Sequence, residues 1–230
     1  MKRLFALMVF ALALAPVASY AQEPTATPSV TNAQAAAATP SVANTQAGHE
    51  YSPLVEKSVN YKNWTLNDLK DNKPVDLRSL VQGKKLVMVV YFAPWCGNWR
   101  NEAPVAARLY EKYKDQGFAV IGVSEYGTRE SVSTFFGPTG APYPVVSESE
   151  SRDDRDKTAH YGYRQATGDT RKWGSPYNVF LEPATLAKSG DVLTEKAWVV
   201  NGELIEADVD KFIADKLKAS TASVITPCKE

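Results

Sequence analysis

The clearest pattern in the chain is two apolar runs separated by an amphipathic segment. Leu86–Phe92 is continuously apolar, β-branched or aromatic, and its length suits a strand buried on both faces. The spacing of Val105, Leu109 and Tyr113 predicts a helix from about Asn101, and Gln116-Gly117 ends it. Phe118–Val123 repeats the buried-strand pattern. The order strand, helix, strand predicts a right-handed βαβ unit with parallel strands.

The C-terminal half continues the alternation of helices and strands. We expect a short helix over Arg129–Phe136 and a strand over Tyr177–Leu181. Asn201-Gly202, between two apolar runs, predicts a β-hairpin, and residues 209–217 carry the apolar spacing of a closing helix. The fold class is therefore α/β, with a central sheet flanked by helices.

Periodicity fails between Ser147 and Ser175, which mark an insertion at about 147–175. The segment contains a solvated charge run and scattered aromatic residues, and loops of this length are usually functional or disordered. Two interpretations stay open, a surface insertion and a lid or partner-contact loop.

The N-terminus predicts export. Two basic residues, an apolar run to Leu14 and the ending Ser19-Tyr20-Ala21 are typical of a signal peptide at residues 1–21. The run is too short to span a membrane. Residues 22–50 are rich in Ala, Thr and Pro and predict a disordered leader; the folded domain is expected over 51–219, with a flexible tail at 220–230. We expect a mature chain without a membrane span, in the periplasm or secreted.

The composition excludes two classes of function. Formal net charge is zero, which argues against a nucleic-acid-binding surface. The chain has two cysteines and two histidines, His49 and His160, and their spacing does not fit a metal site. We expect neither metal nor cofactor.

Cys96 is the candidate for chemistry. It lies between the first buried strand and its helix, where the helix dipole and unpaired backbone N–H groups favour a thiolate. The carboxyl end of a strand in an open α/β sheet is also where ligands bind. The alternative is an inert cysteine that packs as a small hydrophobic residue.

The stretch from Phe92 to Gly97, which reads Phe-Ala-Pro-Trp-Cys-Gly, resembles the active-site approach of thioredoxins. The wider chain, over roughly residues 60–218, is similar to their exported TlpA/ResA-type relatives. The segments that carry this resemblance are the entry hairpin 64–77, the residues Arg100, Glu102 and Pro104, the second core strand, and Gly174-Ser175-Pro176 ahead of an apolar strand.

The resemblance implies roles for the residues around Cys96. Cys96 would be the nucleophile, with Trp95, Gly97, Trp99, Glu102, Ser175 and Pro176 as supporting residues. Pro176 would be a cis proline that presents the Ser175 backbone to an extended substrate. Glu102 would be the acid that tunes the thiol, or alternatively a first-turn glutamate that complements the helix dipole.

The departure from the family motif limits the chemistry. The family uses Cys-x-x-Cys, in which the second cysteine resolves the mixed disulfide formed by the first. Here Trp99 occupies the fourth position, so an ordinary dithiol cycle is not expected. Cys228 is within reach as a resolving thiol; the alternative is a terminal thiol left free or pairing between chains.

Two functions remain. The first is a single-cysteine thiol-disulfide oxidoreductase in which Cys96 acts by mixed-disulfide or sulfenic-acid chemistry on thiol- or disulfide-bearing envelope proteins or small thiols. The second is a non-catalytic binding module that keeps the redoxin fold.

Processing gives the first testable prediction. Because the Ser-Tyr-Ala ending fits a signal peptidase, N-terminal sequencing of the exported protein should begin at Gln22. A mature chain that still begins with Met1 in the membrane fraction would contradict the prediction.

Overall fold

The apolar run Leu86–Phe92 forms β5 at the centre of an eight-stranded mixed sheet within residues 48–222, the part of the chain that the computed structural model describes. The sheet order is β2-β9-β8-β5-β6-β7-β3-β4, and β1 pairs separately with β10. The strands are β1 (Tyr51–Ser52), β2 (Val55–Lys62), β3 (Thr65–Asp68), β4 (Pro74–Asp76), β5 (Leu86–Phe92), β6 (Phe118–Ser124), β7 (Val145–Ser147), β8 (Tyr177–Leu181), β9 (Val192–Val200) and β10 (Glu203–Leu204).

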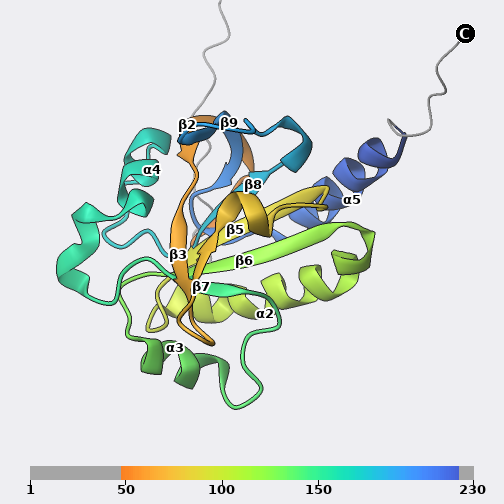
Figure 1. Ribbon diagram of the computed structural model, residues 1–230. Coiled ribbons are helices and arrows are strands. Elements are labelled where there is room, and N and C mark those ends of the chain that lie inside the picture. The colour runs from red at the N-terminus through yellow and green to blue at the C-terminus, as the bar shows by residue number, and fades with distance from the viewer. Residues whose placement is uncertain (1–47, 223–230) are drawn as a thin grey trace, which may run out of the picture. The chain divides into compact units, whose positions relative to one another are not determined.

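Helices cover both faces of this sheet, as in the thioredoxin-like fold that the sequence predicts. The α-helices are α1 (Leu77–Leu80), α2 (Gly97–Tyr113), α3 (Arg129–Phe136), α4 (Ala159–Thr167) and α5 (Glu206–Ala222); the 3₁₀ helices are η1 (Lys114–Gln116), η2 (Arg152–Lys157) and η3 (Pro183–Thr185). In Figure 1, α2 runs alongside β6, and α4 and α5 lie on the left and right of the view.

Alternate residues of β5 belong to two hydrophobic cores. Leu86, Met88, Val90 and Phe92 pack with buried residues of α2 and α5. Val87, Val89 and Tyr91 pack on the other face, with Tyr61, Leu77 and Tyr163 among their partners. Every residue of β5 is buried, which confirms the expectation of a strand covered on both faces.

Several predicted elements agree closely with the structure. β5, α3 and β8 have the predicted bounds, and β6 extends one residue further, to Ser124. α2 begins at Gly97, earlier than the predicted Asn101, because its first turn holds a single apolar residue, Trp99, and one residue shows no period. The chain leaves η1 at Gly117, whose φ of 101° is easily adopted only by glycine. β5 and β6 are parallel, as predicted.

The predicted hairpin at Asn201-Gly202 is wrong. β9 pairs with β2 and β8, whereas β10 pairs in parallel with β1. The N–H of Glu203 donates to the carbonyl oxygen of Glu50 at 2.8 Å, and a Cβ at Gly202 would lie 2.3 Å from the same oxygen. The incoming chain before β1 therefore occupies the edge that a hairpin partner would need.

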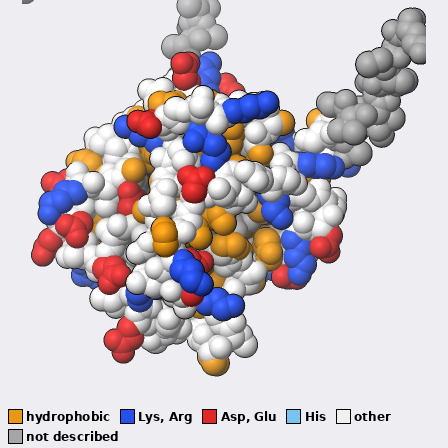
Figure 2. Space-filling view, viewed as in Figure 1, with side chains coloured by type: hydrophobic (Ala, Val, Ile, Leu, Met, Phe, Trp, Pro, Cys, Tyr) orange, Lys and Arg blue, Asp and Glu red, His pale blue; other side chains and the backbone are white. Residues whose placement is uncertain are grey.

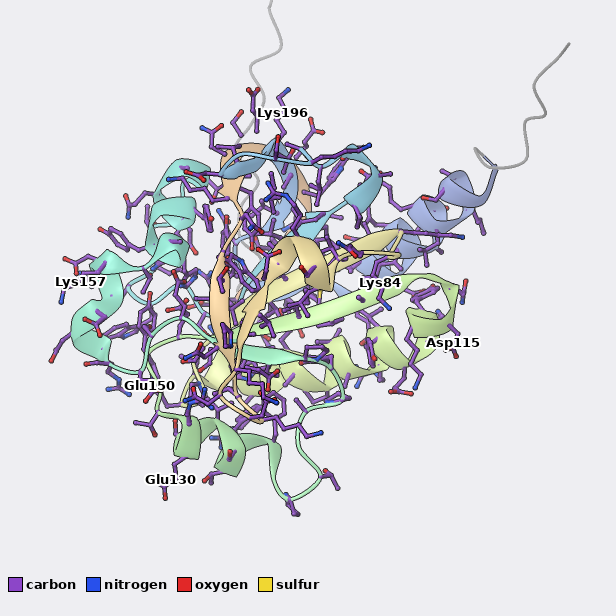
Figure 3. The ribbon with its side chains drawn as sticks, viewed as in Figure 1. Lys84, Asp115, Glu130, Glu150, Lys157 and Lys196 are labelled. Atoms are coloured by element: carbon purple, nitrogen blue, oxygen red, sulfur yellow. The ribbon has the colours of Figure 1, made fainter. Side chains whose placement is uncertain are left out.

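Segment 147–175 contains two helices that the sequence pattern did not reveal. η2 and α4 lie within it, and α4 is capped by Thr158, whose side-chain oxygen accepts from the N–H of Tyr161. Charged residues such as Glu150 and Lys157 are exposed and point outward in Figure 3. One face of α4, however, is buried.

Both ends of the chain lie beyond the described residues. The expected signal peptide, nearly all of the leader and Cys228 fall there, while α5 continues to Ala222, into the expected tail. No helix between residues 48 and 222 combines the length and apolarity needed to cross a bilayer. On the face shown in Figure 2, basic and acidic side chains are interspersed.

The burial of Trp99 generates a stability prediction. Its side chain is fully buried, and its ring stacks on Phe92 with ring centroids 4.5 Å apart. Trp99→Cys should lower the free energy of unfolding by about 3–5 kcal/mol, the range for large-to-small changes at a buried aromatic residue. Urea denaturation measures this loss.

Trp198→Cys is the matched control, because Trp198 is only partly buried on β9. The control should lose less than half as much stability. Equal losses in the two variants would show that Trp99 contributes no more packing than the partly buried Trp198.

Candidate active site

Cys96 caps the N-terminus of α2, directly after the loop that leaves β5. Its backbone is extended (φ −78°, ψ 129°), its N–H donates to the carbonyl of Ala93 at 3.0 Å, and its carbonyl accepts from the N–H of Arg100 at 3.1 Å. The side chain is partly exposed. The sulfur therefore lies where free helix N–H groups and the positive end of the dipole favour an anion.

The loop Gly174-Ser175-Pro176 meets Cys96 from the other side. The Ser175–Pro176 peptide bond is cis, as the resemblance implied. The Cys96 thiol donates to the carbonyl oxygen of Ser175 at 3.2 Å, and the N–H of Ala93 donates to Ser175 Oγ at 2.9 Å. The loop is thus joined both to Cys96 and to the end of β5.

Trp95 and Gly97 flank the cysteine differently. Trp95 Nε1 donates to the carbonyl of Tyr126 at 2.8 Å, and its ring meets the edge of Trp173 at 5.3 Å between centroids. The guanidinium of Arg152 lies 4.0 Å from the Trp95 ring centroid, an arrangement that favours cation–π attraction. Gly97 is exposed, and a Cβ there would meet open space.

Trp99 lies in the core, not at the open surface of the site. Besides Phe92, its ring stacks on Phe135 of α3, with centroids 5.8 Å apart. Its indole N–H is buried without a hydrogen-bond partner. The position at which the family motif has its second thiol therefore holds an apolar filler between α2, β5 and α3.

Glu102 is buried, and the first-turn interpretation of it is wrong. α2 begins at Gly97, so Glu102 lies in the second turn. Its Oε2 accepts from the N–H of Leu204 at 2.8 Å and from Asn178 Nδ2 at 3.4 Å, which ties α2 to β10 and β8. Burial raises the pKa of Glu102 to about 8. That Glu102 tunes the Cys96 thiol stays a hypothesis.

The sequence analysis missed a buried polar layer beneath the Ser175 loop. His160 of α4 contacts the carbonyl of Gly174 through Nε2 at 3.1 Å and the hydroxyl of Tyr126 through Nδ1 at 3.2 Å. Arg164, one helical turn on, forms an ion pair with Asp169 at 3.3 Å and also donates to the carbonyl of Arg171. These residues come from the segment without apolar periodicity, and their spacing along a helix was one signal that could have revealed them.

A pair of acidic residues borders this layer. Glu125 follows β6 and is fully buried, with its Oε2 accepting from the Ser149 hydroxyl at 2.7 Å. Burial, reinforced by the neighbouring Glu148, raises its pKa well above the usual value. Glu148 in turn accepts from the backbone N–H of Ala159 at 2.6 Å and so caps α4. Among residues 48–222, no group of three or more His, Cys, Asp or Glu side chains has the arrangement of a metal site.

Comparisons with known proteins assign the chain to a family. Residues 59–182 match the model of the AhpC/TSA family. The chain is 30% identical over 178 residues to "Probable glutathione peroxidase 5" of Arabidopsis thaliana, covering 72% of this chain and 96% of that protein. It is 31% identical over 84 residues to "Thiol-disulfide oxidoreductase ResA" of Bacillus thuringiensis, covering 36% of this chain and 47% of that protein.

A solved structure of a thioredoxin family thiol:disulfide interchange protein from Chlorobium tepidum is 23% identical, with a TM-score of 0.48, covering 68% of this chain and 94% of that one. The fold and the family match define a thioredoxin-like redoxin. The chain belongs to the AhpC/TSA family.

The buried carboxyl of Glu102 generates a pH prediction. Its pKa of about 8 in the folded state lies above the usual 4.5, so the folded protein holds a proton there that the unfolded chain releases. This contribution to stability is complete below about pH 4.5 and is lost as the pH rises through 8, by at most about 1.4 kcal/mol per pH unit. The Glu102→Gln substitution removes this pH-dependent contribution, because Gln does not titrate.

We measure unfolding free energies between pH 5 and 8. As the pH rises, the wild type should lose stability relative to Glu102→Gln. Glu111→Gln, at an exposed position on the same helix, is the control and should show little pH-dependent difference. Parallel curves for Glu102→Gln and wild type would mean that Glu102 is ionised in the folded protein.

Proposed function

We propose that the protein is an exported thiol-disulfide oxidoreductase that acts through Cys96 as its single nucleophile. The observation that carries this proposal is the placement of the Cys96 sulfur at the N-terminus of α2, 3.2 Å from the Ser175 carbonyl of the cis-proline loop. Helix N-termini favour the thiolate, which is the nucleophile in disulfide exchange. Partial exposure of Cys96 gives substrates access to it.

The proposed reaction is a thiol-disulfide exchange in two steps. The Cys96 thiolate attacks one sulfur of a substrate disulfide; a Cys96–substrate S–S bond forms, the substrate S–S bond breaks, and the departing thiolate takes up a proton. A second thiol then attacks the mixed disulfide and restores the Cys96 thiolate. The net result is exchange of one thiol for another, with no change in the number of disulfides.

The second thiol is proposed to come from another molecule or from Cys228. Cys96 is the one cysteine among residues 48–222, and Trp99 offers no nucleophile. The proposed partners are thiol- or disulfide-bearing proteins of the cell envelope, or small thiols. Export rests on the N-terminal pattern described above.

Peroxide reduction is the second candidate. The AhpC/TSA match and the relative named as a glutathione peroxidase favour it. In that reaction the Cys96 thiolate takes one oxygen from a hydroperoxide and becomes a sulfenic acid, an alcohol or water leaves, and two thiols then reduce the sulfenic acid to regenerate Cys96, forming a disulfide and water.

Adduct formation tests these proposals. Cys228→Ser protein, reduced and freed of reductant, is mixed at pH 7.5 with hydroxyethyl disulfide or with hydrogen peroxide. We expect a mixed disulfide on Cys96 that persists until an external thiol is added, because no resolving thiol lies within the described domain. Intact-protein mass spectrometry and peptide mapping follow the adduct, and Cys96→Ser/Cys228→Ser is the blank.

The outcomes separate the candidates. Faster capture of a sulfenic acid with peroxide than of a mixed disulfide would favour the peroxidase. Absence of both adducts, in protein whose denatured form reacts, would overturn thiol chemistry and leave the binding module. If wild type clears its mixed disulfide without added thiol and Cys228→Ser does not, then Cys228 is the resolving group.

A further inference from the structure

His160 is a fully buried histidine with both ring nitrogens engaged. Gly174 offers a carbonyl oxygen, which can only accept, so His160 Nε2 carries the proton and donates to it at 3.1 Å. Nδ1 then accepts from the hydroxyl of Tyr126 at 3.2 Å. The imidazole also stacks on Tyr91, with centroids 4.9 Å apart and planes 3° from parallel. The ring therefore has one orientation and one tautomer.

The contact with Gly174 acts on the residue that faces the reactive sulfur. Gly174 directly precedes Ser175, whose carbonyl accepts from the Cys96 thiol. Gly174 has a φ of 56°, and a Cβ there would lie 1.7 Å from Arg164 Nε, so the guanidinium packs against its backbone. On the other side, Arg171 donates to the Pro176 carbonyl at 2.8 Å. The loop is held at each of its residues.

The other partner of His160 leads back to Cys96. Tyr126 has a φ of 58°, an outlier for a bulky residue, which persists only where the surroundings hold it. Its carbonyl accepts from Nε1 of Trp95, the residue before Cys96. Hydrogen bonds and chain neighbours thus form a closed ring that includes the cysteine. Its members, in order, are Cys96, Trp95, Tyr126, His160, Gly174 and Ser175.

We propose that His160 is a positioning residue for Cys96: it holds the Gly174-Ser175 backbone so that the Ser175 carbonyl faces the sulfur. This rests on the proposed function, in which Cys96 is the reacting thiol. His160 touches no substrate, and it acts through the loop and through Tyr126.

The electrostatic surroundings fit an uncharged role. Burial, followed by the nearby Arg164, lowers the pKa of His160 well below its usual value, while Asp169 opposes the shift and Arg171 adds to it. The imidazole is therefore neutral at ordinary pH. It works as a fixed donor and acceptor and does not act as a charge.

The direction of the effect follows from which form of Cys96 the carbonyl stabilises. A carbonyl oxygen accepts from S–H but repels a thiolate, so the Ser175 contact favours the protonated thiol. Loosening the loop should make the thiolate form at lower pH. A single hydrogen bond of ordinary strength corresponds to a shift of about half a pH unit or more.

The experiment measures iodoacetamide alkylation of Cys96 against pH in full-length Cys228→Ser protein. In His160→Leu, which lacks both contacts, the pH of half-maximal rate should fall by about half a unit or more. In His160→Gln, whose side-chain N–H₂ can reach the Gly174 carbonyl, the profile should return toward that of the parent. Tyr163→Phe is the matched control, because it loses a buried hydroxyl on the same helix that accepts from the Lys62 N–H.

A stability effect alone would overturn the proposal. If His160→Leu and Tyr163→Phe lose similar thermal stability and neither changes the alkylation profile, His160 is merely a packing residue. Should His160→Leu fail to fold, Tyr126→Phe serves instead, since it removes the donor to Nδ1 and should shift the profile in the same direction; an unchanged profile in Tyr126→Phe would overturn the proposal. Alkylation needs no disulfide substrate, so this result is separate from the success or failure of the exchange assay.

Discussion

The candidate active site depends on one hydrogen bond, from the N–H of Ala93 to the side-chain oxygen of Ser175 at 2.9 Å. Where β5 ends, this buried backbone N–H has no strand partner and needs an acceptor. Ser175 supplies it, and by doing so brings its own carbonyl within 3.2 Å of the Cys96 sulfur. Ser175 therefore does two things at once: its side chain satisfies the backbone at the end of β5, and its carbonyl is placed as the acceptor for the thiol.

The elements that the sequence predicted well are those whose signal is local and apolar. β5, β8 and α3 have the expected bounds because buried strands are continuous apolar runs and because Gly137 ends α3. The hairpin at Asn201-Gly202 failed for a non-local reason. Its partner edge belongs to β1, a strand of two residues whose pairing with β10 no periodic pattern reveals.

α4 shows why part of the site was invisible in the sequence. Its buried residues, His160, Tyr163, Arg164 and Thr167, recur at the spacing of one helical face, but three of the four are polar. A search for apolar periodicity therefore finds nothing there. Thr158 at the start and Gly168 in the left-handed conformation at the end were local signals of a helix. The position of Cys96 and its meeting with Ser175, by contrast, followed from the strand-helix order and the resemblance.

Trp99 stands where the family motif has its second cysteine, and this determines from which side a mixed disulfide on Cys96 could be resolved. In a Cys-x-x-Cys helix the fourth position carries the second thiol on the inner side of the first turn, but here that side is filled by a ring packed between Phe92 and Phe135. Attack on a mixed disulfide requires a thiolate to approach the sulfur itself. Cys96 is open only on its partly exposed side, since its inner side packs against the core. In the proposed exchange reaction, a resolving thiol must therefore arrive from the side on which the substrate binds. Under that proposal, substrate and resolving thiol use the same opening. The Gly174-Ser175-Pro176 loop borders this opening and is held in place from α4, so it is in a position to affect both.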